Sequence, residues 1–320
     1  MNTVPFQLIQ KYAVHIRILN NFKRPTGTTF HADTSGSTSY IGAITNLIEY
    51  SGNDAITLDI LMRNQDLRRL TVDSFGFNAR SYLSMFSNVQ LYSGFHCLET
   101  LKFARNCLDP SAIRDILRPI SSTLVKLHTY DDGFLRGRKD AGGDGGDGGD
   151  NDDDELVLPK LRELRIGLAR ALGTVKNLPK VCPNLEKLDN HNLNGWFFDP
   201  LVYIEHDDLE EIFRSQSCPK LNKLNITRNL KNDRLLINLL NSHPGLNDLG
   251  LEISAGSTEC ELAVTRHAET AYMGNELSFQ HIKVLWSIDF STSWSLGRTD
   301  RGIIRKETLE EPRLFGRSFN

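Results

Sequence analysis

Six cationic side chains recur along the central part of the chain, each directly beside a leucine: Arg69, Lys102, Lys126, Arg165, Lys187 and Lys223. His128, Tyr130 and His191 lie on or beside the same run. Lysine and arginine side chains bind carboxylates and phosphates through charge-assisted hydrogen bonds. The chemistry that these residues suggest is therefore the recognition of an anionic group.

Residue patterns of known catalytic centres do not accompany these cations. The sequence has no GxSxG, HExxH or GxxxxGK[ST] segment, and its nine histidines are dispersed. His206 stands beside Asp207 and Asp208, but an isolated histidine of this kind is typical of a solvated loop. We expect no enzymatic activity, no metal and no cofactor. A GTPase-activating repeat protein is the less favoured alternative.

The segment over residues 139–155 carries the opposite charge. It holds eight acids between Asp140 and Glu155 and no base in that stretch, and without these eight charges the net charge of −3 would be +5. Such a low-complexity segment cannot build a core, and its spacing fits neither a nine-residue calcium repeat nor an EF-hand loop. It is predicted to be a disordered surface insertion. Weak binding of cations or of a basic partner is the alternative.

The five cysteines are scattered, and no CxxC pair indicates a zinc site or a redox dithiol. The first residues do not form a signal peptide, and no apolar run approaches the 18 residues of a membrane span. We expect a monomer in the cytoplasm or nucleus that binds a protein partner, with no nucleic acid and no membrane.

A repeated pattern, L-x-x-L-x-apolar, positions the cationic residues. Its clearest copies begin at Leu67, Leu98, Leu124, Leu161, Leu185, Leu221 and Leu246. Weaker copies begin at Ile16, Ile44 and Ile282, so that Leu47 and Leu285 are predicted second apolar positions. Steps between successive second positions run from 23 residues, Leu47 to Leu70, to 37 residues, Leu127 to Leu164. Most steps lie near the 20–29 residues of a leucine-rich repeat.

The residues between the copies predict helices. SAIRDILRPI from Ser111 and RLLINLLNSH from Arg234 have apolar residues at helical spacing, and LEEIFRSQ from Leu209 and AITLDILMRN from Ala55 are similar. A unit of one strand and one helix is too small to bury its apolar side alone. The sequence therefore predicts an α/β leucine-rich repeat solenoid of about ten units over residues 1–290. Its parallel sheet would line the concave face of a curved horseshoe, with the helices outside.

Two copies are preceded by a shared segment, CPNLEKL from Cys182 and CPKLNKL from Cys218, with looser versions at LPKL from Leu158 and HPGL from His243. These segments resemble the cysteine-containing leucine-rich repeats of F-box proteins, particularly their divergent fungal members. The resemblance implies a substrate-receptor arm of a cullin-type ubiquitin ligase. The opening LIQKYAVHIRIL is read as the first repeat, so we expect no F-box in this chain, and a ligase adaptor only if an F-box precedes it. A free-standing scaffold is the alternative.

In each strand the leucines point inward and the residues between them face the concave surface. The six cations, with His128, Tyr130 and His191, form what we call the basic ribbon. One interpretation is that the ribbon binds an acidic or phosphorylated partner segment. The alternative is that these charges only keep a strand face soluble. Residues 291–320 lose the repeat spacing and are predicted to form a cap or tail, with a capping helix in IIRKETLEEPRLFG.

Overall fold

A computed structural model of the 320-residue chain divides into two compact units, residues 1–161 and 162–320. The structure describes residues 12, 15–22, 44–52, 61–72, 89–103, 112–129, 133–135, 156–166, 177–190, 218–230, 233–246, 248–253, 259, 262–263, 266–267, 281–286, 293–298 and 304–306. The predicted insertion over residues 139–155 lies outside them. So do LEEIFRSQ, Cys107 and Cys260.

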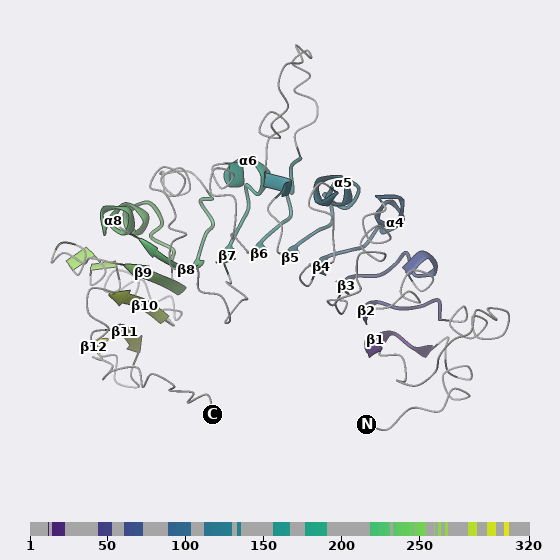
Figure 1. Ribbon diagram of the computed structural model, residues 1–320, viewed down its shortest axis with the longest axis horizontal. Helices are drawn as coiled ribbons and strands as arrows, with labels where there is room; N and C mark the ends of the chain where they lie inside the picture. The colour runs from purple at the N-terminus through teal and green to yellow at the C-terminus, as the bar shows by residue number, and fades with distance from the viewer. Residues whose placement is uncertain are drawn as a thin grey trace, which may run out of the picture. The chain divides into compact units, whose positions relative to one another are not determined.

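The first unit is a ladder of parallel strands with helices on one side (Figure 1). Each strand pairs in parallel with the next one along the chain: β1 (Ile18–Phe22), β2 (Glu49–Gly52), β3 (Arg69–Val72), β4 (Thr100–Phe103) and β5 (Lys126–Thr129). The helical elements here are α4 (Val89–Ser93), α5 (Ile113–Leu117) and the 3-10 turn η3 (Gly133–Leu135). The chain thus alternates strand and helix, which gives an α/β fold.

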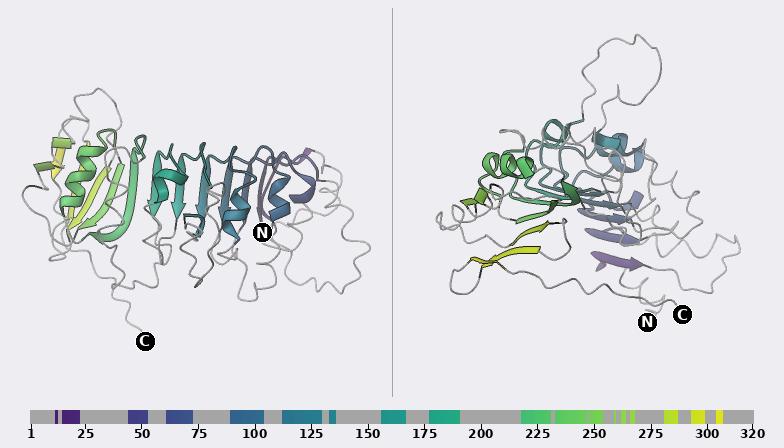
Figure 2. Two further views of the ribbon diagram at one scale, coloured as in Figure 1. Left: turned by 90° about the horizontal axis from the view of Figure 1, so that it is seen from above. Right: turned by 60° about the vertical axis from the view of Figure 1, so that its left-hand side comes forward.

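The second unit repeats this plan and then departs from it. Its parallel strands are β6 (Glu163–Ile166), β7 (Lys187–Asn190), β8 (Lys223–Leu230), β9 (Asp248–Ile253) and β10 (His281–Trp286). Helices α6 (Leu178–Val181) and α8 (Asp233–Ser242) lie on one side of them (Figure 1). Figure 2 shows the strands of each unit side by side. This open parallel arrangement is compatible with a solenoid.

The C-terminal strands correct one prediction. Strand β11 (Ser293–Arg298) pairs antiparallel with β10, and β12 (Ile304–Lys306) pairs antiparallel with β11. The predicted capping helix is therefore wrong at Ile304–Lys306, where the backbone is extended. A strand edge can meet its hydrogen-bonding needs by adding another strand. The β-branched Ile303 and Ile304 also favour that conformation.

Leucines in register build the core of each unit. Leu70, Leu101 and Leu127 are paired across β3, β4 and β5 and are fully buried. Burying a leucine side chain contributes about 1.5–3 kcal/mol. The backbone hydrogen bonds between strands repeat in the same way. The carbonyl of Arg68 accepts the N–H groups of Glu99 and Thr100 at 2.9 and 3.0 Å. The carbonyls of Glu99, Arg162 and Glu186 do the same for the next strand.

Two predicted second positions are wrong by three residues. Leu70 is in register with Tyr50 rather than Leu47, and Leu249 is in register with Ile282 rather than Leu285. Each segment has apolar residues at spacing three on both sides of the predicted position, so the local pattern fits either register. The neighbouring strand decides between them.

Tyr50 replaces leucine in β2 because its strand lacks the next apolar side chain. Val72 and Phe103 occupy that place in β3 and β4, whereas β2 has Gly52. A Cβ atom on Gly52 would collide with the ring of Tyr50. The fully buried ring thus fills the space of two side chains.

This arrangement predicts a compensating pair of substitutions. Gly52→Val is expected to lower the free energy of unfolding by about 1–3 kcal/mol, because the new side chain overlaps the Tyr50 ring. Combining it with Tyr50→Leu restores the Leu-x-Val pattern of β3 and should recover most of the loss. Urea unfolding of both variants measures this. An additive loss in the double variant contradicts the account.

The helices predicted between the repeats are present where they fall in the described part of the chain. In α5 the predicted apolar face is fully buried, and in α8 Leu235, Leu236, Leu239 and Leu240 are buried. Of AITLDILMRN, Leu61–Asn64 is described, with one helical turn over residues 61–63. The described helical segments are short, so packing against the strands rather than helix propensity stabilises them.

One position at the turn before six of the strands, β3, β4 and β6 to β9, is buried although it is occupied by different residue types. It lies three residues before the first leucine and holds Asn64, Phe95, Leu158, Cys182, Cys218 and His243, each no more than 3% exposed. At five of these sites its carbonyl accepts the N–H of that leucine, at 2.9–3.2 Å. The sequence pattern C-P-x-L is one variant of this turn. We call the position the corner residue.

Asn64 is the corner residue with a specific polar role. Its Oδ1 accepts the N–H of Leu47 at 2.8 Å, and its Nδ2 donates to the carbonyl of Ile44 at 2.8 Å. Both groups belong to the preceding turn of the chain and both bonds are buried. In the second unit, Nε2 of the buried His267 bonds the carbonyl of Leu246 at 2.7 Å.

Cys182 and Cys218 occupy equivalent corners, because each lies six residues before one of the paired leucines Leu188 and Leu224. Burial raises the pKa of the Cys182 thiol well above its ordinary value, and the neighbouring Cys218 raises it further. Burial also raises the pKa of Cys218 to about 12. Both thiols therefore stay protonated near neutral pH, and they pack as small apolar side chains.

Thiol labelling tests this burial. At pH 8 we expect maleimide to modify the exposed Cys97 rapidly, whereas Cys182 and Cys218 should react only as the protein unfolds. Because the folded-state pKa of Cys218 is raised, this thiol's contribution to stability is complete below its unfolded pKa of about 8.5 and is lost as pH rises toward 12. The pKa of Cys182 is raised as well, so its contribution has the same sign. Peptide mapping by mass spectrometry assigns each modified site. Equal labelling rates for the three would contradict the corner packing.

Candidate functional site

Two rows of residues follow the strand register at the positions that flank the second apolar residue of each strand. In the first unit, one row pairs Glu49, Arg69, Thr100 and Lys126, and the other pairs Ser51, Thr71, Lys102 and His128. In the second unit, the rows are Glu163, Lys187, Lys223 and Asp248, then Arg165, Asp189, Asn225 and Gly250. They continue onto β10 as His281 and Lys283. We call these two rows the strand face of each unit.

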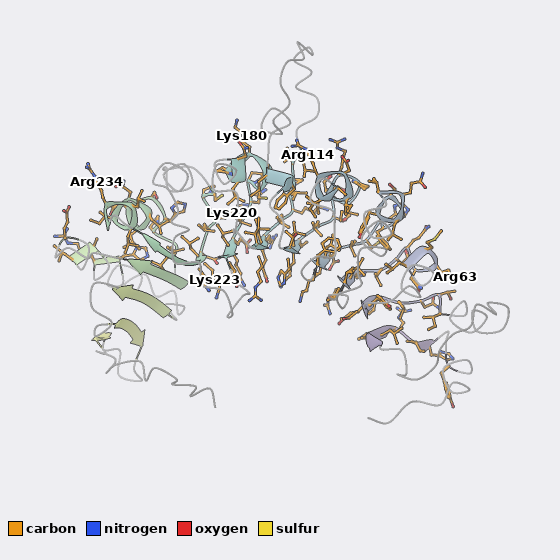
Figure 3. The ribbon with its side chains drawn as sticks, viewed as in Figure 1. Arg63, Arg114, Lys180, Lys220, Lys223 and Arg234 are labelled. Atoms are coloured by element: carbon orange, nitrogen blue, oxygen red, sulfur yellow. The ribbon has the colours of Figure 1, made fainter. Side chains whose placement is uncertain are left out.

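Every described member of the basic ribbon lies on a strand face. Arg69, Lys102, Lys126 and His128 belong to the first unit; Arg165, Lys187 and Lys223 belong to the second. Figure 3 shows Lys223 on the strand side of its unit, whereas Lys180 and Arg234 lie on the helix side. Tyr130 and His191 lie outside the described residues. Their positions follow the repeat spacing, because strand side chains alternate between faces.

Carboxylates on adjacent strands neutralise part of the ribbon, which the sequence pattern did not reveal. Arg69 donates from Nη1 to Oε2 of Glu49 at 3.0 Å. In the second unit, Nε of Arg165 lies 3.6 Å from Oδ2 of Asp189, and both side chains are largely buried. The partners in each pair are 20 or more residues apart. A comparison of equivalent positions in neighbouring repeats could have found these pairs, because Glu49 and Arg69, like Arg165 and Asp189, occupy the same place in successive strands.

Two further ion pairs join residues that directly precede strands. Nη1 of Arg68 lies 3.5 Å from Oε1 of Glu99, and Nε of Arg162 lies 3.6 Å from Oε1 of Glu186. These two pairs occupy the same repeat position in their units. Their side chains are 30–65% exposed, so water screens each pair, which stabilises the fold by about 1 kcal/mol at most.

The Arg69–Glu49 pair gives a measurable prediction. Arg69→Ala is expected to cost less than about 1 kcal/mol of unfolding free energy, because the arginine side chain is 63% exposed and screened by water. A double-mutant cycle with Glu49→Ala, followed by urea unfolding, isolates the pair. A coupling above about 2 kcal/mol would show that the pair is structural rather than a surface contact.

The rows of the two units contain different numbers of charged residues. On β2 to β5, three cations stand against one carboxylate, Glu49. In the second unit, the residues in these rows include four cations, Arg165, Lys187, Lys223 and Lys283, and three acids, Glu163, Asp189 and Asp248. By residue type, the rows of both units therefore hold more cations than acids.

Three basic residues of the first unit lie at adjacent register positions on β4 and β5. Lys102 is in register with His128, and Thr100 is in register with Lys126. Neighbouring strands are about 4.8 Å apart, and alternate residues of one strand are about 6.6 Å apart. Lys102, Lys126 and His128 therefore form a compact group, which we call the β4–β5 cluster. Within the two rows, β4 and β5 carry no carboxylate.

Among the described residues, no three histidine, cysteine, aspartate or glutamate side chains gather in a way that could hold a metal ion. The described helices include none that is long and apolar enough to cross a membrane. Compared with known proteins, the sequence matches no family model, and no curated protein shows significant similarity to it.

Proposed function

We propose that the chain is a leucine-rich repeat solenoid that binds another protein through its strand faces. The observation that carries this proposal is the pair of in-register rows in each unit. The leucines between those rows are buried, and the residues in the rows repeat at the fixed spacing of the strands. The residue type in a row can therefore vary from strand to strand without changing the core. A surface of this kind suits recognition of an extended partner, and curved repeat arrays use such surfaces for binding. The horseshoe curvature predicted from the repeats is part of this proposal.

Site-specific crosslinking tests where a partner binds. The photo-reactive residue p-benzoylphenylalanine would replace Thr71 or Asn225 on the strand faces, or Met62 or Arg234 on the helix sides. We expect the same partner to be crosslinked from the two strand positions and not from the helix positions. Met62 and Arg234 are exposed and serve as matched controls. Crosslinking mainly from the helix positions would contradict the proposal.

We further propose that the chain acts as the substrate-receptor arm of an F-box-type ubiquitin ligase. The cysteine-proline corners at Cys182 and Cys218 favour this over a scaffold without ligase coupling. Both cysteines are buried, and each carbonyl accepts the N–H of the leucine three residues later. At Cys182 this turn ends helix α6 and precedes β7, and at Cys218 it precedes β8. The proline just after each cysteine cannot continue a helix.

Ligase coupling has its own test. The purified cullin adaptor is mixed with the chain, alone and extended by any F-box encoded in frame upstream of Met1. Capture only by the extended chain supports the receptor role. Failure of both forms to bind the adaptor favours the free-standing scaffold, and leaves protein binding by the strand faces as a separate question.

A further inference from the structure

We propose that Cys182 and Cys218 form a site of reversible oxidative modification, at which an intramolecular disulfide bond links two successive repeats. The proposal depends neither on binding by the strand faces nor on ligase coupling. The sequence pattern did not predict a redox dithiol, because the two cysteines are far apart in the chain and form no CxxC pair. The repeat nevertheless places them at equivalent corners of neighbouring strands.

Strand pairing brings the two corners together. Leu188 of β7 is in register with Leu224 of β8, and each cysteine lies six residues before one of these leucines. The pairing extends toward the corners, because the carbonyl of Glu186 accepts the N–H groups of Asn222 and Lys223 at 2.8 and 3.1 Å. Neighbouring strands are about 4.8 Å apart, and a disulfide bond spans Cα separations of about 4.4–6.8 Å. Corners that continue the strand spacing therefore suit a disulfide bond.

Both cysteine side chains lie in the core of the second unit. Cys182 is 0% exposed and Cys218 is 1% exposed, and both are free thiols. Cys218 also lies close enough to Cys182 to raise the pKa of its thiol, in addition to the larger effect of burial. The two sulfur atoms are therefore neighbours inside the protein, shielded from thiols of other molecules.

The backbone at Cys218 indicates that more than packing is required there. Within the described part of the chain, Cys218 is the residue other than glycine that has a positive φ, 49°. Glycine is the usual residue in this left-handed conformation, because a Cβ atom is strained there. The equivalent Cys182 has a φ of −127°, so the turn does not demand the strained form. A strained residue of this kind favours a role for its side chain.

A peroxide is the oxidant in the proposed reaction. The thiolate of one cysteine attacks a peroxide oxygen, the O–O bond breaks, and a sulfenic acid and one water form once the leaving hydroxide takes up a proton. The second thiol attacks the oxidised sulfur, the S–O bond breaks, and the S–S bond forms as a second water leaves. Two thiols and one hydrogen peroxide thus give one disulfide and two waters.

Burial determines when this reaction takes place. Both thiols stay protonated in the closed core, because burial raises the pKa of each. The first step needs a thiolate, so it waits until one of the two turns opens. The neighbouring thiol is then already in place, which favours the disulfide over further oxidation of the sulfenic acid. The product joins the segments that precede β7 and β8 and holds these strands together.

The test treats the full-length Cys97→Ser variant with hydrogen peroxide at pH 8, in urea below the unfolding transition. Replacing the exposed Cys97 prevents disulfides between molecules. After trypsin digestion without reductant, we expect residues 181–187 linked to residues 215–220, two hydrogens lighter than the separate peptides. The thermal midpoint should rise by about 3 °C or more, because a disulfide constrains the unfolded chain. Dithiothreitol should reverse both changes.

The matched control adds Cys182→Ala to the same background, and it should show neither the linked peptide nor the higher midpoint. Circular dichroism verifies that this control is folded, and Cys218→Gly, which suits the positive φ, replaces it otherwise. Sulfinic or sulfonic acid at both cysteines without a linked peptide overturns the proposal. So does preferential linkage to Cys107 or Cys260, or linkage that forms only in urea that unfolds the protein.

Discussion

Asn64→Ala is expected to lower the free energy of unfolding by about 2–4 kcal/mol. The substitution leaves the N–H of Leu47 and the carbonyl of Ile44 without the side-chain partners that now lie 2.8 Å away. An unsatisfied buried backbone group costs about 1–3 kcal/mol. The loss is therefore larger than the small volume of asparagine alone would produce. Urea unfolding followed by circular dichroism measures it.

Two further variants identify the cause of that loss. Asn64→Leu restores apolar volume at the corner, as at Leu158, but supplies no hydrogen bond, so it should remain destabilised. Asp66→Ala, two residues further in the same turn and exposed, should change stability by less than about 0.5 kcal/mol. Full stability in Asn64→Leu would mean that the corner requires only volume, and that the two bonds contribute little.

Leu101→Ala is expected to destabilise the protein by about 2–5 kcal/mol. Leu101 lies in β4 between Leu70 and Leu127 and is fully buried, so truncation leaves a cavity within a row of paired leucines. Leu188→Ala, at the same repeat position in the second unit and 1% exposed, should cost a similar amount. Equivalent positions in a repeat make equivalent contacts with the strands on either side.

Met62→Ala is the control for both leucine variants. The Met62 side chain is 63% exposed, so its truncation removes little buried area and should change stability by less than about 0.5 kcal/mol. Urea midpoints and slopes for the three variants are compared directly. A loss below about 1 kcal/mol in both leucine variants would be incompatible with a core built from these rows.

The strand faces depend on that core in a simple way. Buried leucines on alternate positions fix each strand's orientation, and this places the residues between them on the opposite side of the strand. Substitutions at exposed strand-face positions such as Lys126 should therefore alter stability little. Core variants such as Leu101→Ala should alter stability first and binding only through it.

The amino-acid sequence by itself determined which residues alternate on the strands. The L-x-x-L-x spacing predicted the strands at β3 to β9 and put Arg69, Lys102, Lys126, His128, Arg165, Lys187 and Lys223 on the strand faces. Helices α5 and α8 were equally predictable. These features are local, because strand and helix periodicity are set by residues a few positions apart.

The tertiary structure alone decided everything that depends on the neighbouring strand. Leu47 and Tyr50 fit the repeat equally well by sequence, and pairing with Leu70, together with the Asn64 bonds, selects Tyr50. Glu49 and Asp189 reduce the charge of the ribbon only because parallel pairing brings them beside Arg69 and Arg165. Residues 20 or more positions apart interact here. Two of the cationic residues, Arg69 and Arg165, thus have acidic neighbours that only the tertiary structure could show.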